Sequence, residues 1–211
     1  MKKFFVLAVC VLFLLPGSAK ADILNLGGSY TYPIYLLNGT TPLTVGGGSI
    51  DVSYLNGNKL DYVYCVDLFK TVSVPAQYPD TSVTTDGTVY GTAVNNAAQI
   101  AWLLSNYGSA GQTDAQGALQ AAIWHVEYTN VVLDISKATA PMITDYNNIL
   151  AALGSNTGTI SNFYWITPGT LSGTNLTQYQ GLVAPVPIPA AAWLLGSGLV
   201  GLVGLRRRFR K

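Results

Sequence analysis

The stretch "TDAQGALQAAIWHVEY", residues 113–128, has the pattern of an amphipathic helix. Thr113 and Gln116 have the spacing of a capping box, in which two side chains satisfy the free backbone N–H groups of the first turn. Apolar residues then return at helical spacing, at Leu119, Ala122, Ile123 and Val126. This spacing predicts a helix that packs one face on a core.

Two further helices are predicted on either side of this one. Residues 95–108, "NNAAQIAWLLSNYG", have an asparagine start signal and end at Gly108. A third helix is predicted from Thr139 through Leu150, with a proline in its first turn and Gly154 after its end. These three helices make the middle of the chain a helical region.

The chain before the helices has the composition of β-structure. Residues 23–90 are rich in Val, Tyr, Thr and Gly, with alternating patches at 49–55 and 59–66. Asn56-Gly57-Asn58 lies between these patches and predicts a hairpin turn. The segment "NFYWITP", residues 162–168, returns to a strand pattern. We therefore expect an α+β fold, in which a β-rich sandwich or barrel lobe packs against a small helical lobe.

The N-terminus has the order of parts found in secretory signal peptides. Lys2 and Lys3 precede an apolar run over residues 4–15, and Ala19-Lys20-Ala21 is a small-x-small cleavage site. Cys10 lies inside the apolar run and leaves with it. The mature chain then has Cys65 as its single cysteine, so no intramolecular disulfide is possible.

The C-terminus has three parts in a fixed order. A proline motif is followed by an apolar helix over residues 190–205, and a basic cluster follows. The motif and cluster residues are Val186, Pro187, Ile188, Pro189, Arg206, Arg207 and Arg208. This layout resembles the PEP-CTERM sorting signal, in the variant with an aliphatic residue between the two prolines.

The sorting-signal resemblance implies a route through a Gram-negative envelope. A transmembrane helix would hold the protein in the inner membrane, an exosortase would cleave it, and the product would reach the cell surface or extracellular matrix. Signal peptidase would act at the other end. We therefore divide the chain into a signal peptide (1–21), an extracellular domain (22–184) and a sorting signal (185–211).

Charge excludes one class of partner for the extracellular domain. The two end segments hold most of the basic residues, so residues 22–186 keep three lysines and no arginine against ten acids, a net charge of −7. A nucleic-acid-binding domain needs a basic surface, which this domain lacks. The acidic balance instead suits a soluble extracellular protein.

Cys65 and His125 leave a catalytic alternative open. His125 could act as a base toward Cys65 in a hydrolase or transferase, with Asn130 or Asp134 orienting it. A metal site is not expected, because one cysteine and one histidine do not make a coordination shell.

A second interpretation starts from Gln120. Gln120 is off the apolar stripe, and Trp124 lies above it on the same side of the helix. A strand containing "YCVDL" (64–68) and a later helix containing "LQAAIW" (119–124) resemble the thioester domains of bacterial surface adhesins. Tyr64 supplies the aromatic residue before the cysteine. Leu119 departs from the family, which usually has threonine before the glutamine.

This resemblance implies an internal thioester between Cys65 and Gln120. The bond would serve as a single-turnover electrophile toward a protein amine or glycan hydroxyl on a surface, matrix or host partner, without a cofactor and without true catalysis. Expected neighbours of the bond are Tyr64, Asp67, Trp124 and His125. A non-reactive structural protein of the extracellular matrix or biofilm remains the alternative outside enzymes.

Overall fold

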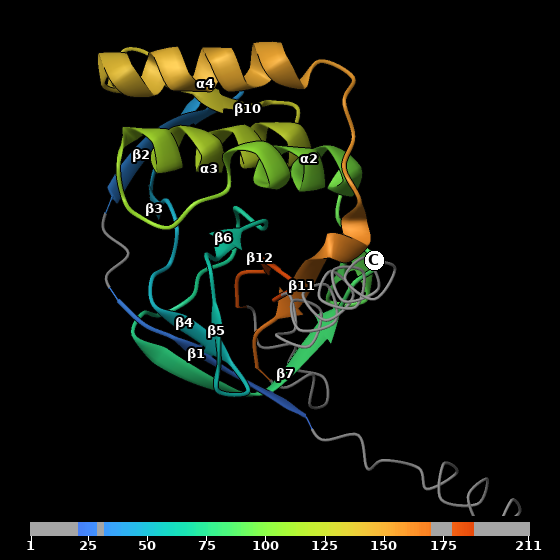
Figure 1. Cartoon of the computed structure of the whole chain (residues 1–211). Helices are drawn as coiled ribbons and strands as arrows, with labels where there is room; N and C mark the ends of the chain where they lie inside the picture. Colours follow the sequence, from blue (N-terminus) through green and yellow to red (C-terminus); the bar gives the residue numbers. More distant parts are fainter. Residues whose placement is uncertain (1–20, 29–31, 170–178, 188–211) are drawn as a thin grey trace, which may run out of the picture.

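The computed structural model describes residues 21–28, 32–169 and 179–187 of the chain. Two layers make up this part: helices with a small sheet, and a larger sheet beneath them (Figure 1). The predicted α+β fold, a β-rich part against a helical part, is confirmed in this arrangement. The predicted signal peptide (1–21, apart from its last residue) and the apolar and basic parts of the sorting signal lie outside the described residues.

The larger sheet contains seven strands in the order β5-β4-β1-β7-β11-β12-β6. Every pairing in it is antiparallel. The strands are β1 (Asp22–Leu26), β4 (Ser53–Leu55), β5 (Asn58–Leu60), β6 (Tyr64–Cys65), β7 (Ala76–Thr84), β11 (Phe163–Thr167) and β12 (Leu182–Pro185). Strand β6 forms one edge of this sheet and lies beneath the helices (Figure 1).

The helical layer contains three α-helices and a three-stranded sheet. The helices are α2 (Ala97–Tyr107), α3 (Asp114–Glu127) and α4 (Ala140–Leu153). The small sheet has the order β10-β2-β3, with β2 (Tyr32–Asn38), β3 (Thr41–Gly47) and β10 (Val131–Leu133). A two-stranded ribbon, β8 (Thr88–Val89) with β9 (Thr92–Ala93), and a short 3-10 helix (Ile160–Asn162) complete the fold.

The helix ends agree with the sequence signals. Thr113 and Gln116 form the predicted capping box at the start of α3, where the Thr113 N–H donates to Gln116 Oε1 at 3.2 Å. Thr139 caps α4, and Gly108 and Gly154 follow the ends of α2 and α4. These signals therefore lie directly beside the helix ends that they mark, whereas Asn96, the N-cap residue of α2, makes no side-chain capping bond.

The hairpin turn is also confirmed, whereas the alternating patch at residues 59–66 contains only two short pieces of strand, the end of β5 and all of β6. Asn56 and Gly57 have positive φ angles of 52° and 80°, as a tight turn between β4 and β5 requires. Strand β6 contains only two residues, and residues 63–66 are all buried. The expected inside–outside alternation fails here because protein covers both faces of β6.

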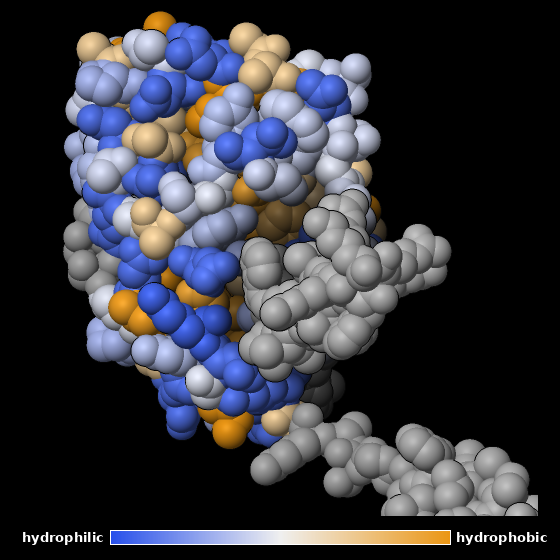
Figure 2. Space-filling view, in the orientation of Figure 1, coloured by the Kyte–Doolittle hydropathy of each residue, from blue (hydrophilic) through white to orange (hydrophobic). Residues whose placement is uncertain are grey.

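A single hydrophobic core joins the two layers, with Trp124, Trp165 and Tyr64 as its largest fully buried side chains. Hydrophilic residues cover most of the described surface in Figure 2, and hydrophobic residues appear there in small groups. Within the described ranges, no helix has the length and apolar character needed to cross a membrane. The predicted sorting helix is outside those ranges.

Candidate functional site

Strand β6 and helix α3 bring Cys65 and Gln120 together at the junction of the two layers. The Cys65 N–H donates to Gln120 Oε1 at 2.9 Å, and Gln120 Nε2 donates to the Cys65 carbonyl oxygen at 2.7 Å. Both residues have zero exposed surface. Two residues 55 positions apart in the chain are therefore locked side by side in the core.

These two hydrogen bonds fix the orientation of the Gln120 carboxamide. Only the oxygen can accept from an N–H and only the nitrogen can donate to a carbonyl, so rotating the amide by half a turn would break both bonds. The bond to Oε1 withdraws electron density from the amide carbonyl and would stabilise negative charge on that oxygen. Nε2, which would be the leaving group if a thioester formed, points to the Cys65 carbonyl.

The segment around Cys65 is held from two sides. Cys65 pairs with Leu182 of β12, and the Val66 N–H donates to the Gly181 carbonyl at 2.9 Å. On the other side, the Tyr62 hydroxyl donates to the Leu104 carbonyl at 3.0 Å, near the end of α2. Together these contacts join the segment around Cys65 to β12 and to α2.

The expected neighbour Tyr64 is part of this anchoring. Its side chain is fully buried, and its hydroxyl donates to the Ser109 carbonyl at 2.9 Å, just beyond α2. Burial raises the pKa of Tyr64 well above its usual value. Tyr64 therefore acts as a neutral hydrogen-bond donor that ties the cysteine strand to the helical layer.

Gln120 is held by close packing of α3 on the small sheet and on α4. A Cβ atom added at Gly47 of β3 would lie 3.1 Å from Gln120 Cγ and 2.1 Å from Ile34 Cδ1. A Cβ atom added at Gly117 would lie 2.6 Å from Met142 Cε of α4. Both glycines therefore allow α3 to approach its neighbours closely.

The whole middle of α3 is buried, not only the predicted stripe. Every residue from Gly117 to Trp124 is buried, because sheet strands and the other helices enclose this part of α3. Trp124 has no exposed surface, and its Nε1 is a buried donor without a partner among the described residues. Gln120 thus lies in the core although it is outside the apolar stripe of α3. Trp124 lies one turn further along the helix and is buried as well.

His125 lies on a different side of α3 from Gln120. Its Nδ1 lies 2.6 Å from the Val131 carbonyl of β10, and its ring packs edge-on against Tyr146 of α4 at 6.2 Å. The structure therefore places His125 against α4 and β10. Both contacts lie on the side of α3 away from Gln120.

The residues expected to orient His125 have other partners. Asn130 Nδ2 donates to Asn38 Oδ1 at 3.2 Å, and Asp134 Oδ1 accepts from the Ser136 backbone N–H and hydroxyl. No hydrogen bond joins either residue to His125 within the described part of the chain. The described contacts of Asn130 and Asp134 are therefore with residues other than His125.

Asp67 follows Cys65 closely and caps a turn. Its Oδ1 accepts from the Phe69 N–H at 3.0 Å and from the Tyr128 hydroxyl at 3.4 Å, and its Oδ2 pairs with Lys70 Nζ at 3.2 Å. Asp67 thus fastens the segment after β6 to the end of α3. Its role is to position the backbone next to Cys65.

Glu127 was not predicted as a site residue, although it is the single glutamate of the chain. It lies seven residues after Gln120, on the same face of α3. Glu127 lines a cavity of about 210 Å³ with Val66, Asp67, Lys70 and Tyr128. Its position two turns from Gln120 was the signal that could have identified it.

Burial raises the pKa of Glu127 to about 8, and the nearby Asp67 carboxylate adds to the effect. Its Oε2 atom is buried and has no hydrogen-bond partner among the described residues. Glu127 is therefore largely protonated at neutral pH, and the polar cluster beside the site carries fewer negative charges than its composition suggests.

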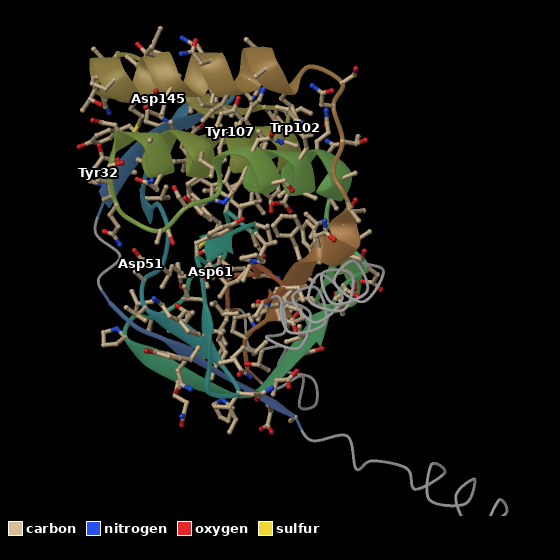
Figure 3. All side chains as sticks on the ribbon, in the orientation of Figure 1. Tyr32, Asp51, Asp61, Trp102, Tyr107 and Asp145 are labelled. Carbon is tan, nitrogen blue, oxygen red and sulfur yellow. The ribbon has the colours of Figure 1, made fainter. Side chains whose placement is uncertain are left out.

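The aromatic side chains in this part of the molecule form separate groups. Tyr62 packs against Tyr64 with ring centroids 5.7 Å apart, and Tyr128 packs against Phe69 at 5.0 Å. Trp102 packs instead against Tyr107 of α2 at 6.0 Å (Figure 3). The first two groups lie on segments adjacent to Cys65, and Trp102 belongs to the outer part of α2.

Comparison with known families agrees with the geometry. Residues 62–158 match the family model "TED: Thioester domain". This segment starts three residues before Cys65 and contains Gln120, so the matched region is similar to a thioester domain. Metal ligation has no candidate in the described part, where no group of three or more His, Cys, Asp or Glu side chains converges.

One solved structure is also similar. It is the N-terminal thioester domain of fibronectin-binding protein SfbI from Streptococcus pyogenes, with 14% sequence identity and a TM-score of 0.44. The alignment covers 77% of this chain and 98% of that one. A search of curated proteins finds no match.

Proposed function

We propose that this protein is an exported surface protein that attaches covalently to a partner through an internal Cys65–Gln120 thioester. The observation that carries the proposal is the pair of hydrogen bonds, 2.9 and 2.7 Å, that hold the Gln120 carboxamide on the Cys65 backbone. The match of residues 62–158 to the thioester-domain family supports the same chemistry.

Formation of the bond would proceed as follows in this arrangement. The Cys65 sulfur attacks Gln120 Cδ, the thiol proton passes to Nε2, and the C–N bond breaks to release ammonia. The Cys65 N–H stabilises the negative charge that develops on Oε1 during the attack. The product is a γ-glutamyl thioester, and no oxidant or cofactor takes part.

Reaction with a partner is the reverse process with a different nucleophile. An amine or hydroxyl attacks Gln120 Cδ, the C–S bond breaks, and Cys65 is released as a thiol. The Cys65 carbonyl, which loses its donor when ammonia leaves, can accept a hydrogen bond from the incoming N–H or O–H group. Each molecule reacts once, so the protein is consumed and does not turn over.

Intact-mass measurement of residues 22–184 tests the proposal. The expected mass is the sequence mass less one ammonia, and methylamine should add to the protein as the deficit disappears. Cys65→Ala and Gln120→Ala should show no deficit and no methylamine adduct. A full sequence mass together with a readily alkylated Cys65 would instead identify a non-reactive structural protein of the matrix.

Export and sorting form the second part of the proposal. The signal peptide (1–21) and the sorting signal (185–211) would deliver the domain to the surface through an inner-membrane intermediate. Signal peptidase and an exosortase would make the two cleavages. Mass spectrometry can identify both ends of the protein purified from cells with and without an exosortase. An unprocessed C-terminus in cells that have an exosortase would overturn the sorting proposal.

A further inference from the structure

Strand β3 forms an open edge of the small sheet. The strand order is β10-β2-β3, so β3 pairs with β2 on one side. In Figure 1 it is the strand of this sheet nearest to β6. The described part of the chain supplies no backbone hydrogen bond to the other edge of residues 44–46. An edge of this kind is a template for a further strand.

The register of the β2–β3 hairpin identifies the outward-facing groups. Asn38 pairs with Thr41 across a two-residue loop, and this closing pair exchanges hydrogen bonds. Along the rest of the hairpin, hydrogen-bonded pairs then alternate with pairs that are not hydrogen-bonded to each other. Pro42, Thr44 and Gly46 belong to the pairs that are not hydrogen-bonded to β2, and Pro42 has no N–H to leave without a partner. The N–H and C=O groups of Thr44 and Gly46 therefore point away from β2.

These groups face a groove. A cavity of about 350 Å³ lies between Thr44–Gly46 of β3 and the segment that follows β6, including Leu68, Lys70 and Val72. Its volume is within the range of ligand pockets. A strand next to β3 would run about 4.8 Å from it, within this space.

The groove leads to the reactive pair. Gly47, the next residue along β3, lies against Gln120 Cγ. Val45 and Gly47 are opposite Ile34 and Tyr32, so they lie on the face of the sheet that packs on α3. Side chains of an added strand opposite Val45 or Gly47 would point to that same face. Such a strand would direct a side chain toward Gln120.

We propose that the outer edge of β3 binds an extended polypeptide segment of the partner by strand addition. Backbone hydrogen bonds to Thr44 and Gly46 would hold the segment, and one side chain opposite Gly47 would meet Gln120. The delivery step rests on the proposed thioester, whereas strand binding does not. A polypeptide is favoured over a glycan because alternating N–H and C=O groups match a second backbone.

A proline substitution tests the edge with little disturbance of the sheet. Thr44→Pro removes an outward N–H, and Pro42 shows that this hairpin accepts proline at such a position. Thr44→Ala keeps the N–H and is the matched control. An unchanged ammonia deficit and an unchanged methylamine rate in both variants would show that the fold and the thioester are intact.

The probe is a capped peptide of alternating threonine and valine with one central lysine. We expect it to react with the wild-type domain roughly tenfold faster than methylamine at equal concentration, since several backbone hydrogen bonds add up. This advantage should vanish in Thr44→Pro, persist in Thr44→Ala, and vanish for a peptide N-methylated on alternate residues. Equal rates in Thr44→Pro and Thr44→Ala would overturn the proposal.

Two further measurements separate the possible failures. Hydrogen exchange in Cys65→Ala, which cannot form a thioester, should show slower exchange at Thr44 and Gly46 when the peptide is added. This result would support strand binding even if the wild-type domain had no ammonia deficit. A linear hexasaccharide that reacts as fast as the peptide would overturn the proposal. So would a wild-type homodimer that becomes monomeric in Thr44→Pro, because the edge of β3 would then bind a second copy of the chain.

Discussion

Gln120 and His125 lie five residues apart on the same helix, yet they differ in burial and in the elements that they contact. Gln120 is fully buried, and its carboxamide is held by the Cys65 backbone. His125 is partly exposed and bonds to a strand carbonyl beside α4. Five residues are about 1.4 turns, so the two side chains leave α3 on different sides. The histidine therefore contacts β10 and α4, whereas the amide contacts Cys65.

The largest effect is expected from Gln120→Glu. This change should abolish the ammonia deficit and methylamine incorporation, because the side chain has lost its amide leaving group. A carboxylate facing the Cys65 carbonyl should also lower the free energy of unfolding by about 3 kcal/mol. Intact mass and urea denaturation measure the two results.

Gln116→Glu is the matched control on the same helix. Position 116 is in the capping box, where glutamate can accept the same backbone hydrogen bond and loses only the Nε2 bond to the Ser109 hydroxyl. This variant should keep the deficit and the wild-type stability. If Gln120→Glu still incorporated methylamine, the thioester would be excluded as the reactive group.

The next effect concerns the pH dependence of stability and Glu127. Its pKa is raised from 4.5 to about 8, so between these values the unfolded chain is ionised while the folded protein keeps the proton. The free energy of unfolding should therefore fall as pH rises through this window, by on the order of 3 kcal/mol, and level off above it.

Glu127→Gln should remove most of this slope. Asp67, Lys70 and Tyr128 surround the same cavity and stay unchanged in the variant. Urea denaturation of both proteins between about pH 4.5 and 8 gives the comparison. An equally steep decline in Glu127→Gln would show that another group is responsible.

A smaller effect is expected at Gly47, which touches the Gln120 side chain. Gly47→Ala should lower the free energy of unfolding by about 2 kcal/mol and reduce the fraction of molecules with the ammonia deficit, because the added methyl group pushes Ile34 and Gln120. Adding Ile34→Val removes the Cδ1 atom that lies nearest and should restore both quantities. Failure of that rescue would show that the methyl group acts elsewhere.

The smallest effect is expected at His125. His125→Ala removes one hydrogen bond to Val131 and a ring contact, so stability should fall by about 1 kcal/mol. The ammonia deficit and the methylamine rate should not change. If His125→Ala folded but no longer reacted with methylamine, His125 would take part in the reaction and the Cys-His hypothesis would be supported.

The sequence determined the features that depend on neighbours in the chain. The capping box at Thr113, the stop at Gly108 and the turn at Asn56-Gly57 are short-range signals, and each is found where expected. The pairing of Cys65 with Gln120 was predicted from two motifs resembling a known family. Periodicity alone placed Gln120 outside the apolar stripe.

Only the tertiary structure decided the burial of Gln120, the separation of His125 from Cys65, and the open edge of β3. These depend on how the elements pack together, and contacts such as that between Cys65 and Gln120, 55 residues apart, leave no local trace in the chain. The raised pKa of Glu127 has the same origin, since desolvation requires a folded environment. Local backbone preferences act within a few residues, whereas the chemistry of this site depends on long-range packing.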